Sequence, residues 1–251
     1  MRNFRPAVSV CVAVYNGAEY ISEQLESILT QLSSIDEVVI VDDCSSDSSV
    51  DIIESFHDAR ITLLRNTENI GHVKSFSKAI SNSKLNYIFL CDQDDIWPSN
   101  RIELFFQNIP SKPRFLITGN SQFIDEMGRS IDFKVDGVIR SRSSKNYLNI
   151  TKLVLGESSY FGCCMMFDRQ FWQLADPISP VFEAHDQWLA ILANTFRCNY
   201  HIDDVVLYRR IHGFNVSYKK RSIFAIFRTR MIQSYMITLA FSKYFKEQVN
   251  V

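Results

Sequence analysis

The stretch Tyr87-Ile88-Phe89-Leu90-Cys91-Asp92-Gln93-Asp94-Asp95 joins a short apolar run directly to three carboxylates. The run is typical of a strand that is buried on both faces. Carboxylates crowded at the end of such a strand repel one another unless a cation lies between them. Mg2+ and Mn2+ prefer oxygen ligands, together with the phosphates of a substrate. The alternative is that Asp94 or Asp95 caps a helix that begins near Pro98.

The composition is that of an ordinary globular protein. The chain has 251 residues, of which 46% are hydrophobic and 22% are charged, and its net charge is -1. This length and hydrophobic content are enough for the core of one large domain or two abutting lobes. The near-neutral net charge argues against a nucleic-acid binder. The six cysteines form no CxxC pair, which favours a reduced, cytoplasmic compartment over a disulfide scaffold or a zinc site. No apolar stretch reaches the ~18 residues of a membrane span.

Strand-like and helix-like patterns alternate in the first half of the chain. Short apolar runs rich in β-branched residues predict strands, and apolar residues on one helical face predict the helices between them. The predicted strands are 8–14, 38–41, 61–64 and 87–91, and the predicted helices are 19–32, about 46–56 and 72–81. This order predicts an α/β fold with a mostly parallel, twisted sheet flanked by helices.

Ligands bind beyond the carboxyl ends of the strands in such a sheet. Three predicted strands end in Tyr15-Asn16-Gly17, in Asp42-Asp43-Cys44-Ser45 and in the acidic cluster, so we expect these groups at one edge. Each ending also has an ordinary interpretation, since Asn16-Gly17 can form a turn and Asp43 or Ser45 can cap a helix. No glycine-rich phosphate loop follows the first strand, so a bound diphosphate would need a metal ion.

The second half of the chain is less regular. We expect strands at 115–120 and 162–167, a helix at 184–196 and a polar surface excursion at 121–149. In the last segment, 218–251, basic residues accompany apolar residues that recur at helical spacing: Phe224, Phe227, Met231, Tyr235 and Leu239. This segment is predicted to be a basic amphipathic helix. Both contact with an anionic membrane surface and packing against protein remain open.

Several motifs resemble those of family 2 glycosyltransferases of the GT-A fold, in the family's order and from Val8 to about Ser217. The opening strand 8–16 is similar, 39–47 resembles the VDDGSxD motif, and Asn69-Ile70-Gly71 resembles the NxG segment. Asp92-Gln93-Asp94-Asp95 is similar to the DxD metal motif, His185-Asp186-Gln187-Trp188 resembles the acidic catalytic motif, and 208–217 resembles a YRxHGxN segment. The run 90–97, with Arg101 downstream, resembles the bacterial rhamnosyltransferase-like branch.

Two positions depart from the family's pattern. Cys44 stands where the family usually has Gly, and a Gly there allows a positive φ that Cys adopts only at a cost. Ile211 stands where relatives often carry Gln, which puts polar contacts at that position in doubt.

The resemblance implies an inverting transfer of a sugar from a nucleotide-diphosphate donor to a hydroxyl, with Mg2+ or Mn2+ as the cofactor. The implied metal ligands are Asp94, Asp92 and His212, and the implied nucleotide-sugar contacts are Ala13, Tyr15, Asp42, Asp43, Asp92, Arg209 and Arg210. His212 and the two arginines can equally belong to a plain basic loop. Tyr15 either stacks on the base or fills the edge of the core. Lys74 either meets the donor or is an ordinary solvated lysine on a helix face.

Asp186 is the implied general base, because an acceptor hydroxyl is a poor nucleophile. Its place at the start of the predicted helix 184–196 would stabilise the anion and lower its basicity. The alternative is an Asp that only satisfies the end of the helix. His185 could orient Asp186 or take its place.

The expected protein is a metal-dependent hexosyltransferase-type enzyme in the synthesis of a bacterial surface polysaccharide. Residues 1–217 would form the GT-A domain, with a nucleotide-sugar-binding half at about 1–117 and an acceptor half at 118–217. The expected donor is dTDP-rhamnose, by the resemblance of 90–97 alone, and a UDP-sugar is the alternative. The acceptor would be a glycan or a lipid-linked glycan. A lipid-linked acceptor lies in the membrane, so we would then expect 218–247 to contact the inner face of the plasma membrane peripherally.

Two other classes stay open at this point. A nucleotidyltransferase also uses a metal and an α/β sheet, although it would usually show a glycine-rich, basic loop after the first strand. A non-catalytic nucleotide-sugar-binding module could keep the fold, although the intact Asp92, Asp94 and Asp186 argue against it.

Overall fold

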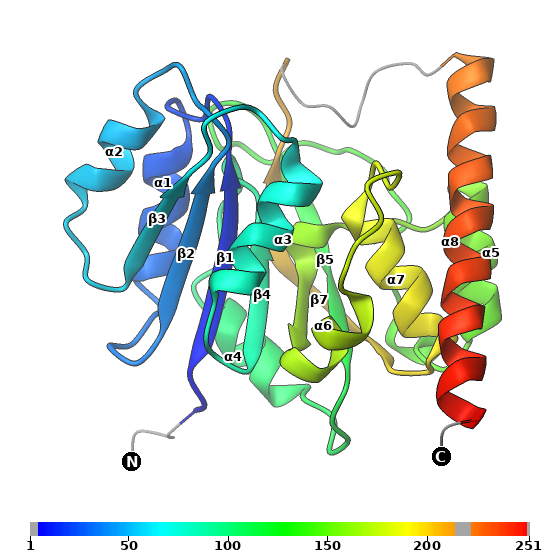
Figure 1. The fold of residues 1–251 in the computed structure, drawn as a ribbon. Helices are drawn as coiled ribbons and strands as arrows, with labels where there is room; N and C mark the ends of the chain where they lie inside the picture. The colour runs from blue at the N-terminus through cyan, green and yellow to red at the C-terminus, as the bar shows by residue number, and fades with distance from the viewer. Residues whose placement is uncertain (1–4, 214–221, 250–251) are drawn as a thin grey trace.

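One seven-stranded sheet runs through both halves of the protein in a computed structural model that describes residues 5–213 and 222–249 (Figure 1). The strand order is β3-β2-β1-β4-β6-β5-β7. The strands are β1 Val8–Val14, β2 Glu37–Asp42, β3 Ile61–Arg65, β4 Tyr87–Cys91, β5 Leu116–Ile124, β6 Met165–Asp168 and β7 Asn199–Arg210. Within the described residues only β6 runs against its neighbours, which confirms the predicted mostly parallel sheet.

Helices cover both faces of the sheet, as the apolar strands require. They are α1 Ile21–Leu29, α2 Ser49–Ser55, α3 His72–Asn82, α4 Arg101–Gln107, α5 Asn146–Leu155, α6 Arg169–Ala175, α7 His185–Thr195 and α8 Ile223–Val249. Helices α3, α6 and α7 pack on one face and α8 lies outside them, whereas α1, α2 and α4 pack on the other. Alternate residues of β1 enter the two cores, with Val10 and Val12 on one side and Cys11 on the other.

The sequence patterns located the first-half elements correctly, and the bounds of β1 and β4 are those predicted. The expected helix start near Pro98 was wrong, since α4 begins at Arg101. The expected strand 162–167 was wrong in its first half, because Gly162–Cys164 forms a 3-10 turn before β6. The polar excursion 121–149 is shorter than expected, because β5 continues to Ile124 and α5 begins at Asn146. Strand β7 was not predicted.

A buried arginine ties β7 and the 3-10 turn to α4. The Arg101 guanidinium donates hydrogen bonds to the carbonyls of Val206, at 2.5 Å, and Cys163, at 2.6 Å. It also lies 4.4 Å from the ring centroid of Trp97. A charged group inside a core is tolerated only where it is hydrogen-bonded. The Cys163 carbonyl, at the end of the 3-10 turn, is thereby hydrogen-bonded to a side chain.

The C-terminal helix α8 packs with one face and exposes the other. The buried face contacts the domain beside α7 and includes Gln233, Met236 and Ala240. The predicted apolar stripe faces outward over most of its length, with exposed Phe224, Phe227, Met231 and Tyr235. The predicted helix is therefore confirmed over α8, and packing on the domain coexists with an exposed apolar face. The described part of the chain contains no helix with the length and apolar run needed to cross a membrane.

Candidate active site

The loops after β1, β2 and β4 meet at one edge of the sheet and are bonded to one another, as predicted. The Gln93 side chain accepts a hydrogen bond from the Tyr15 N–H at 2.7 Å and donates one to the Tyr15 carbonyl at 3.1 Å. Asn16 adopts a positive φ of 49°, and its side chain accepts a hydrogen bond from the Ser46 N–H at 2.8 Å. An added Cβ at Gly17 would come within 2.6 Å of the Gln93 amide, so a larger residue would displace the side chain that bonds Tyr15.

The loop after β1 is not a phosphate cradle. Its four consecutive backbone N–H groups, from Tyr15 to Ala18, all donate to protein side chains: Gln93, Ser45, Ser49 and Asp47. A phosphate loop needs such N–H groups directed at the ligand. The structure therefore offers no support for the phosphate-loop chemistry of a nucleotidyltransferase.

Asp42 and Asp43 have different environments. The Asp43 carboxylate accepts hydrogen bonds from the Asn66 side chain and from the N–H groups of Ile70 and Gly71, at 2.8–2.9 Å. The backbone at Gly71 has φ 86° and ψ 151°, which only glycine adopts readily, and this explains the NxG segment. The helix-cap interpretation of Asp43 is therefore wrong.

Asp42 retains an uncommitted oxygen. One of its carboxylate oxygens accepts a hydrogen bond from the Ser45 N–H at 3.1 Å, while Oδ1 is buried and has no partner among the described residues. Of the two carboxylates, Asp42 is thus the one with an atom left for a ligand. Cys44 adopts a φ of 67°, the conformation that the family's Gly would favour.

The acidic cluster after β4 is held by the end of β7 and does not cap a helix. Asp95 Oδ1 accepts a hydrogen bond from the Arg210 N–H at 3.1 Å, and Asp94 Oδ2 lies 2.8 Å from His212 Nε2. Ile96 and Tyr208 exchange two backbone hydrogen bonds of 2.9 Å, which bring these segments together. Helix α4 has no side-chain cap, so the capping interpretation of Asp94 and Asp95 is wrong.

The side chains at this cluster fit a divalent cation. Ligand atoms of Asp92, Asp95 and Cys163 all lie within 4.8 Å of one another, and Asp95 Oδ2 is buried without a partner in the described residues. Burial raises the pKa of Asp92 and Asp95, and the charge of Asp94 raises both further. Such crowded carboxylates suit Mg2+ or Mn2+, whereas the Cys163 thiol is a softer group than these ions prefer. Asp95 and Cys163 are not among the metal ligands that the sequence implied, which are Asp94, Asp92 and His212.

The two arginines at the end of β7 lie in different surroundings. Arg210 is buried, and its guanidinium donates to the carbonyls of Asp94, Asp125 and Glu126 and to the Glu23 carboxylate. Four of the five N–H groups of the Arg210 guanidinium thus donate to protein oxygens that form the wall of the site.

Arg209 is stacked on Phe161, with 3.8 Å between its guanidinium carbon and the ring centroid. Its charge lowers the pKa of both Asp92 and Asp186, against the larger effect of burial. Arg209 therefore acts electrostatically on both the acidic cluster and the carboxylate at the start of α7.

Asp186 is partly buried in the first turn of α7 and accepts a hydrogen bond from the Gln187 N–H at 2.7 Å. Burial raises its pKa, which makes the carboxylate a stronger base than an ordinary Asp. The expected lowering of basicity by the helix terminus is thus outweighed.

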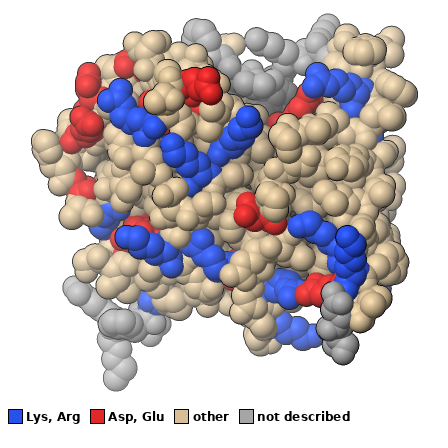
Figure 2. Space-filling model, in the orientation of Figure 1, with Lys and Arg blue, Asp and Glu red and all other residues tan. Residues whose placement is uncertain are grey.

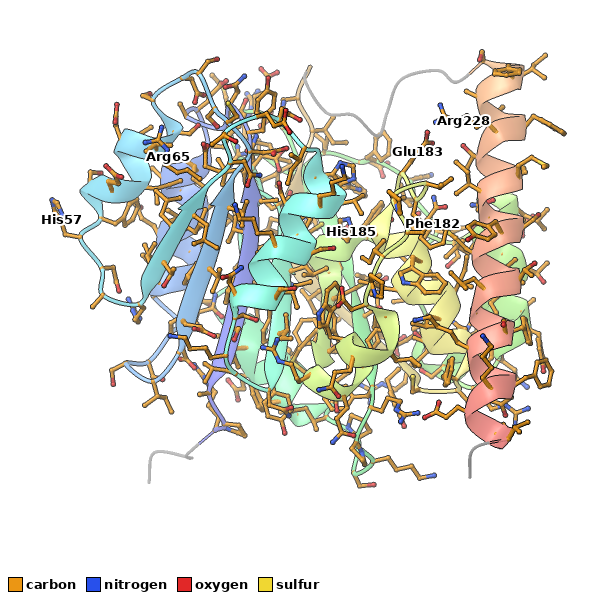
Figure 3. All side chains as sticks on the ribbon, viewed as in Figure 1. His57, Arg65, Phe182, Glu183, His185 and Arg228 are labelled. Carbon is orange, nitrogen blue, oxygen red and sulfur yellow. The ribbon has the colours of Figure 1, made fainter. Side chains whose placement is uncertain are left out.

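His185 is buried behind Asp186, and neither of its ring nitrogens has a hydrogen-bond partner within the described chain. Burial lowers the pKa of His185 to about 4, so the imidazole is neutral at physiological pH. Its ring centroid lies 4.5 Å from that of Phe76 and 5.7 Å from that of His72, both on α3. Figure 3 shows His185 between α3 and α7.

The two remaining predicted residues lie at the end of β1. Ala13 is partly buried in the strand itself, whereas Tyr15 is 48% exposed. Tyr15 therefore does not fill the edge of the core, and its ring is accessible to a planar ligand. Residues 214–217, the last part of the YRxHGxN segment, lie outside the described residues.

The fold and this edge define a GT-A transferase, with clustered carboxylates at the ends of parallel strands. Residues 9–174 match the family described as glycosyl transferase family 2, and the chain belongs to that family.

Two relatives and one solved structure show the likeness in detail. TuaG of Bacillus subtilis, provisionally named for teichuronic acid biosynthesis, is 29% identical over 201 residues, 78% of this chain and 76% of TuaG. The UDP-Glc:alpha-D-GlcNAc-diphosphoundecaprenol beta-1,3-glucosyltransferase WfaP of Escherichia coli is 28% identical over 215 residues, 85% of this chain and 80% of WfaP. The chain spans less than half of some other curated relatives that it matches.

The solved structure is the mannosyltransferase PcManGT from Pyrobaculum calidifontis in complex with GDP-Man and Mn2+. It aligns with a TM-score of 0.61 at 17% identity, over 98% of this chain and 76% of PcManGT. At this identity the likeness supports the fold.

Proposed function

We propose that this protein transfers a sugar from a nucleoside diphosphate to an acceptor hydroxyl, with inversion at the anomeric carbon. The observation that carries this proposal is the cluster of carboxylates after β4, where ligand atoms of Asp92, Asp95 and Cys163 lie within 4.8 Å of one another. In the reaction, Asp186 accepts the proton of the acceptor hydroxyl while the oxygen attacks the anomeric carbon. The bond from that carbon to the diphosphate breaks, and the leaving group takes the electron pair.

The residues of the edge divide the remaining tasks. Asp94, with Asp92 and His212, would hold Mg2+ or Mn2+, and Asp95 Oδ2 lies close by as a further oxygen. When bound, the cation neutralises charge that develops on the leaving diphosphate. Arg209 would pair with phosphate oxygens. Asp42, whose Oδ1 has no partner among the described residues, and the exposed ring of Tyr15 would hold the base and ribose.

The donor in this proposal carries a pyrimidine nucleotide. WfaP is named for UDP-glucose, which favours a UDP-sugar. The run 90–97 resembles the rhamnosyltransferase-like branch, which keeps dTDP-rhamnose as the competing donor. The name of WfaP also specifies a diphosphate-linked lipid acceptor. We extend that class of acceptor, and a role in surface polysaccharide synthesis, to this protein.

The exposed face of α8 is the proposed contact with the inner face of the bacterial plasma membrane. Ile223 and Phe224 are 87% and 79% exposed, and the segment 218–251 carries seven Lys or Arg against one Glu. Large apolar side chains at the surface together with an excess of cations are the features of a helix that binds an anionic lipid surface.

Nucleotide binding tests the proposed site. Calorimetry would compare UDP, dTDP and GDP, each with Mn2+ and with EDTA, on the wild type and on Asp94→Ala. Metal-dependent binding of UDP or dTDP that Asp94→Ala loses supports the proposal. Asp186→Asn is the matched control, which should bind nucleotide normally but transfer no sugar. Metal-independent binding, or no binding of any nucleotide, contradicts the proposal.

A further inference from the structure

A cleft of about 410 Å³ lies between the first turn of α3 and the loop from α6 to α7. Its walls are largely apolar and include Ile70, Val73, Pro177, Ile178, Pro180 and Phe182. Phe182 is buried, and its ring centroid lies 5.1 Å from that of Trp188 in α7. The cleft is therefore backed by the core of the domain, which favours a preformed site.

The cleft adjoins the carboxylate proposed as the base. His72 lines the cleft, and its ring centroid lies 5.7 Å from that of His185, the residue before Asp186. The opposite wall ends in Glu183, three residues ahead of Asp186. Gly71, which also lines the cleft, is held by Asp43 at the proposed nucleotide edge. The cleft therefore borders elements that carry both the proposed nucleotide contacts and Asp186.

One cation at the rim of the cleft is uncommitted. The Lys74 ammonium group donates no hydrogen bond to any described residue and forms no ion pair with one. The two carboxylates of the rim lie near cations instead. Glu183 pairs with Arg228 at 2.6 Å, and Asp176 acts electrostatically on Lys243. Figure 2 shows Lys and Arg side chains gathered over β3 and α3 on this face of the molecule.

The outer rim of the cleft continues into the exposed end of α8. The Glu183–Arg228 pair joins the cleft loop to this helix, as Figure 3 shows. The Phe182 ring centroid lies 5.8 Å from that of Tyr235 in α8. Apolar side chains of the first turns of α8, such as Phe224 and Phe227, are exposed next to Arg228 in the sequence. A long apolar chain that leaves the cleft would therefore meet an apolar surface.

We propose that this cleft binds the lipid-diphosphate part of the acceptor, with the first isoprenoid units on the apolar walls and the diphosphate near Lys74. A nucleotide sugar or a free glycan has no apolar part that would match these walls, whereas a lipid diphosphate has both parts. This inference rests on the proposed glycosyltransferase function and assigns a place to its acceptor. It also assigns Lys74, which the sequence left open, to the acceptor side of the reaction.

Binding of farnesyl diphosphate to the full chain tests the cleft without any turnover. Calorimetry would compare this probe with farnesol and with inorganic pyrophosphate, on the wild type, Lys74→Gln and Ile178→Asn. Lys84→Gln makes the same charge change on an exposed lysine just beyond the other end of α3 and serves as the control. We expect Lys74→Gln to weaken farnesyl diphosphate binding about fivefold, the effect of roughly one exposed ion pair. Ile178→Asn should weaken it at least as much, and Lys84→Gln should not.

The same variants separate failure of the cleft from failure of the proposed function. Metal-dependent UDP or dTDP binding should be unchanged in Lys74→Gln and Ile178→Asn, and neither nucleotide should compete with farnesyl diphosphate. The cleft assignment is overturned if the probe does not bind the wild type, if both variants bind it normally, or if it competes with the nucleotide. Equal binding of farnesol and farnesyl diphosphate would contradict the proposed contact between Lys74 and the diphosphate. Loss of nucleotide binding in the wild type would instead contradict the proposed function.

Discussion

An added methyl group at Gly162 should disturb the active site through His185. A Cβ at this position would lie 2.5 Å from His185 Nε2 and 3.3–3.4 Å from two ring carbons. The imidazole cannot easily move aside, because it is buried against Phe76 and His72. Overpacking of this kind costs about 2 kcal/mol of the free energy of unfolding. For a chain of this length, that lowers Tm by roughly 6 °C.

A double-mutant cycle isolates the contact. Urea unfolding would be measured for the wild type, Gly162→Ala, His185→Ala and the double variant. If the ring causes the cost, the double variant should be more stable than the sum of the single effects predicts, by about 1 kcal/mol or more. Gly213→Ala, whose added carbon meets nothing within 4 Å, controls for the loss of glycine.

Activity provides the second readout of the same change. Because His185 precedes Asp186 at the start of α7, its displacement should move the proposed base and lower kcat by about 10- to 100-fold. Nucleotide binding, at the other side of the site, should change little. Additive free energies in the cycle, or a Gly162→Ala protein with normal stability, would refute the reasoning.

Four further predictions concern other parts of the molecule. Asp43→Asn should lower the free energy of unfolding by about 2 kcal/mol, measured in urea, because an amide has one acceptor oxygen for the three hydrogen bonds of the carboxylate. Arg101→Met should cost about 3 kcal/mol in the same assay, because it leaves two buried carbonyls unpaired. His185 takes up its proton at pH about 4 in the folded state and at about 6.5 when unfolded, so the wild type should lose roughly 3 kcal/mol relative to His185→Gln as the pH falls between these values. A flat difference between those two proteins from pH 7 to pH 4 would contradict the buried, neutral imidazole. Phe227→Ser should reduce cosedimentation with phosphatidylglycerol vesicles, and Ser234→Ala, also exposed on α8, should not.

The fold of the first half was predictable because its signals are local. Strands buried on both faces are apolar throughout, and the helices between them show a regular apolar face, so short windows of sequence locate both. The convergence of Asn16, Asp42 and the acidic cluster followed from the same patterns, because parallel strands end at one edge. The sequence alone thus determined the parallel strands of the first half, the edge where their polar ends meet and the family resemblance of the motifs.

The tertiary structure decided how the site is completed. Tyr208 pairs with Ile96, far away in the chain, and this pairing sets His212 against Asp94 and Arg210 in the wall of the site. No local pattern encodes such a contact, because it depends on which strands become neighbours in the sheet.

The tertiary structure also decided the roles of residues whose function depends on their surroundings and not on their residue type. Asp42 and Asp43 are identical in chemistry, yet both oxygens of Asp43 accept hydrogen bonds, whereas Asp42 Oδ1 has no partner among the described residues. Burial, which no residue specifies by itself, raises the pKa of Asp186 above the value that its helix position suggested. The sequence therefore determined which groups gather at the edge, and long-range packing decided which of them have atoms left for a ligand.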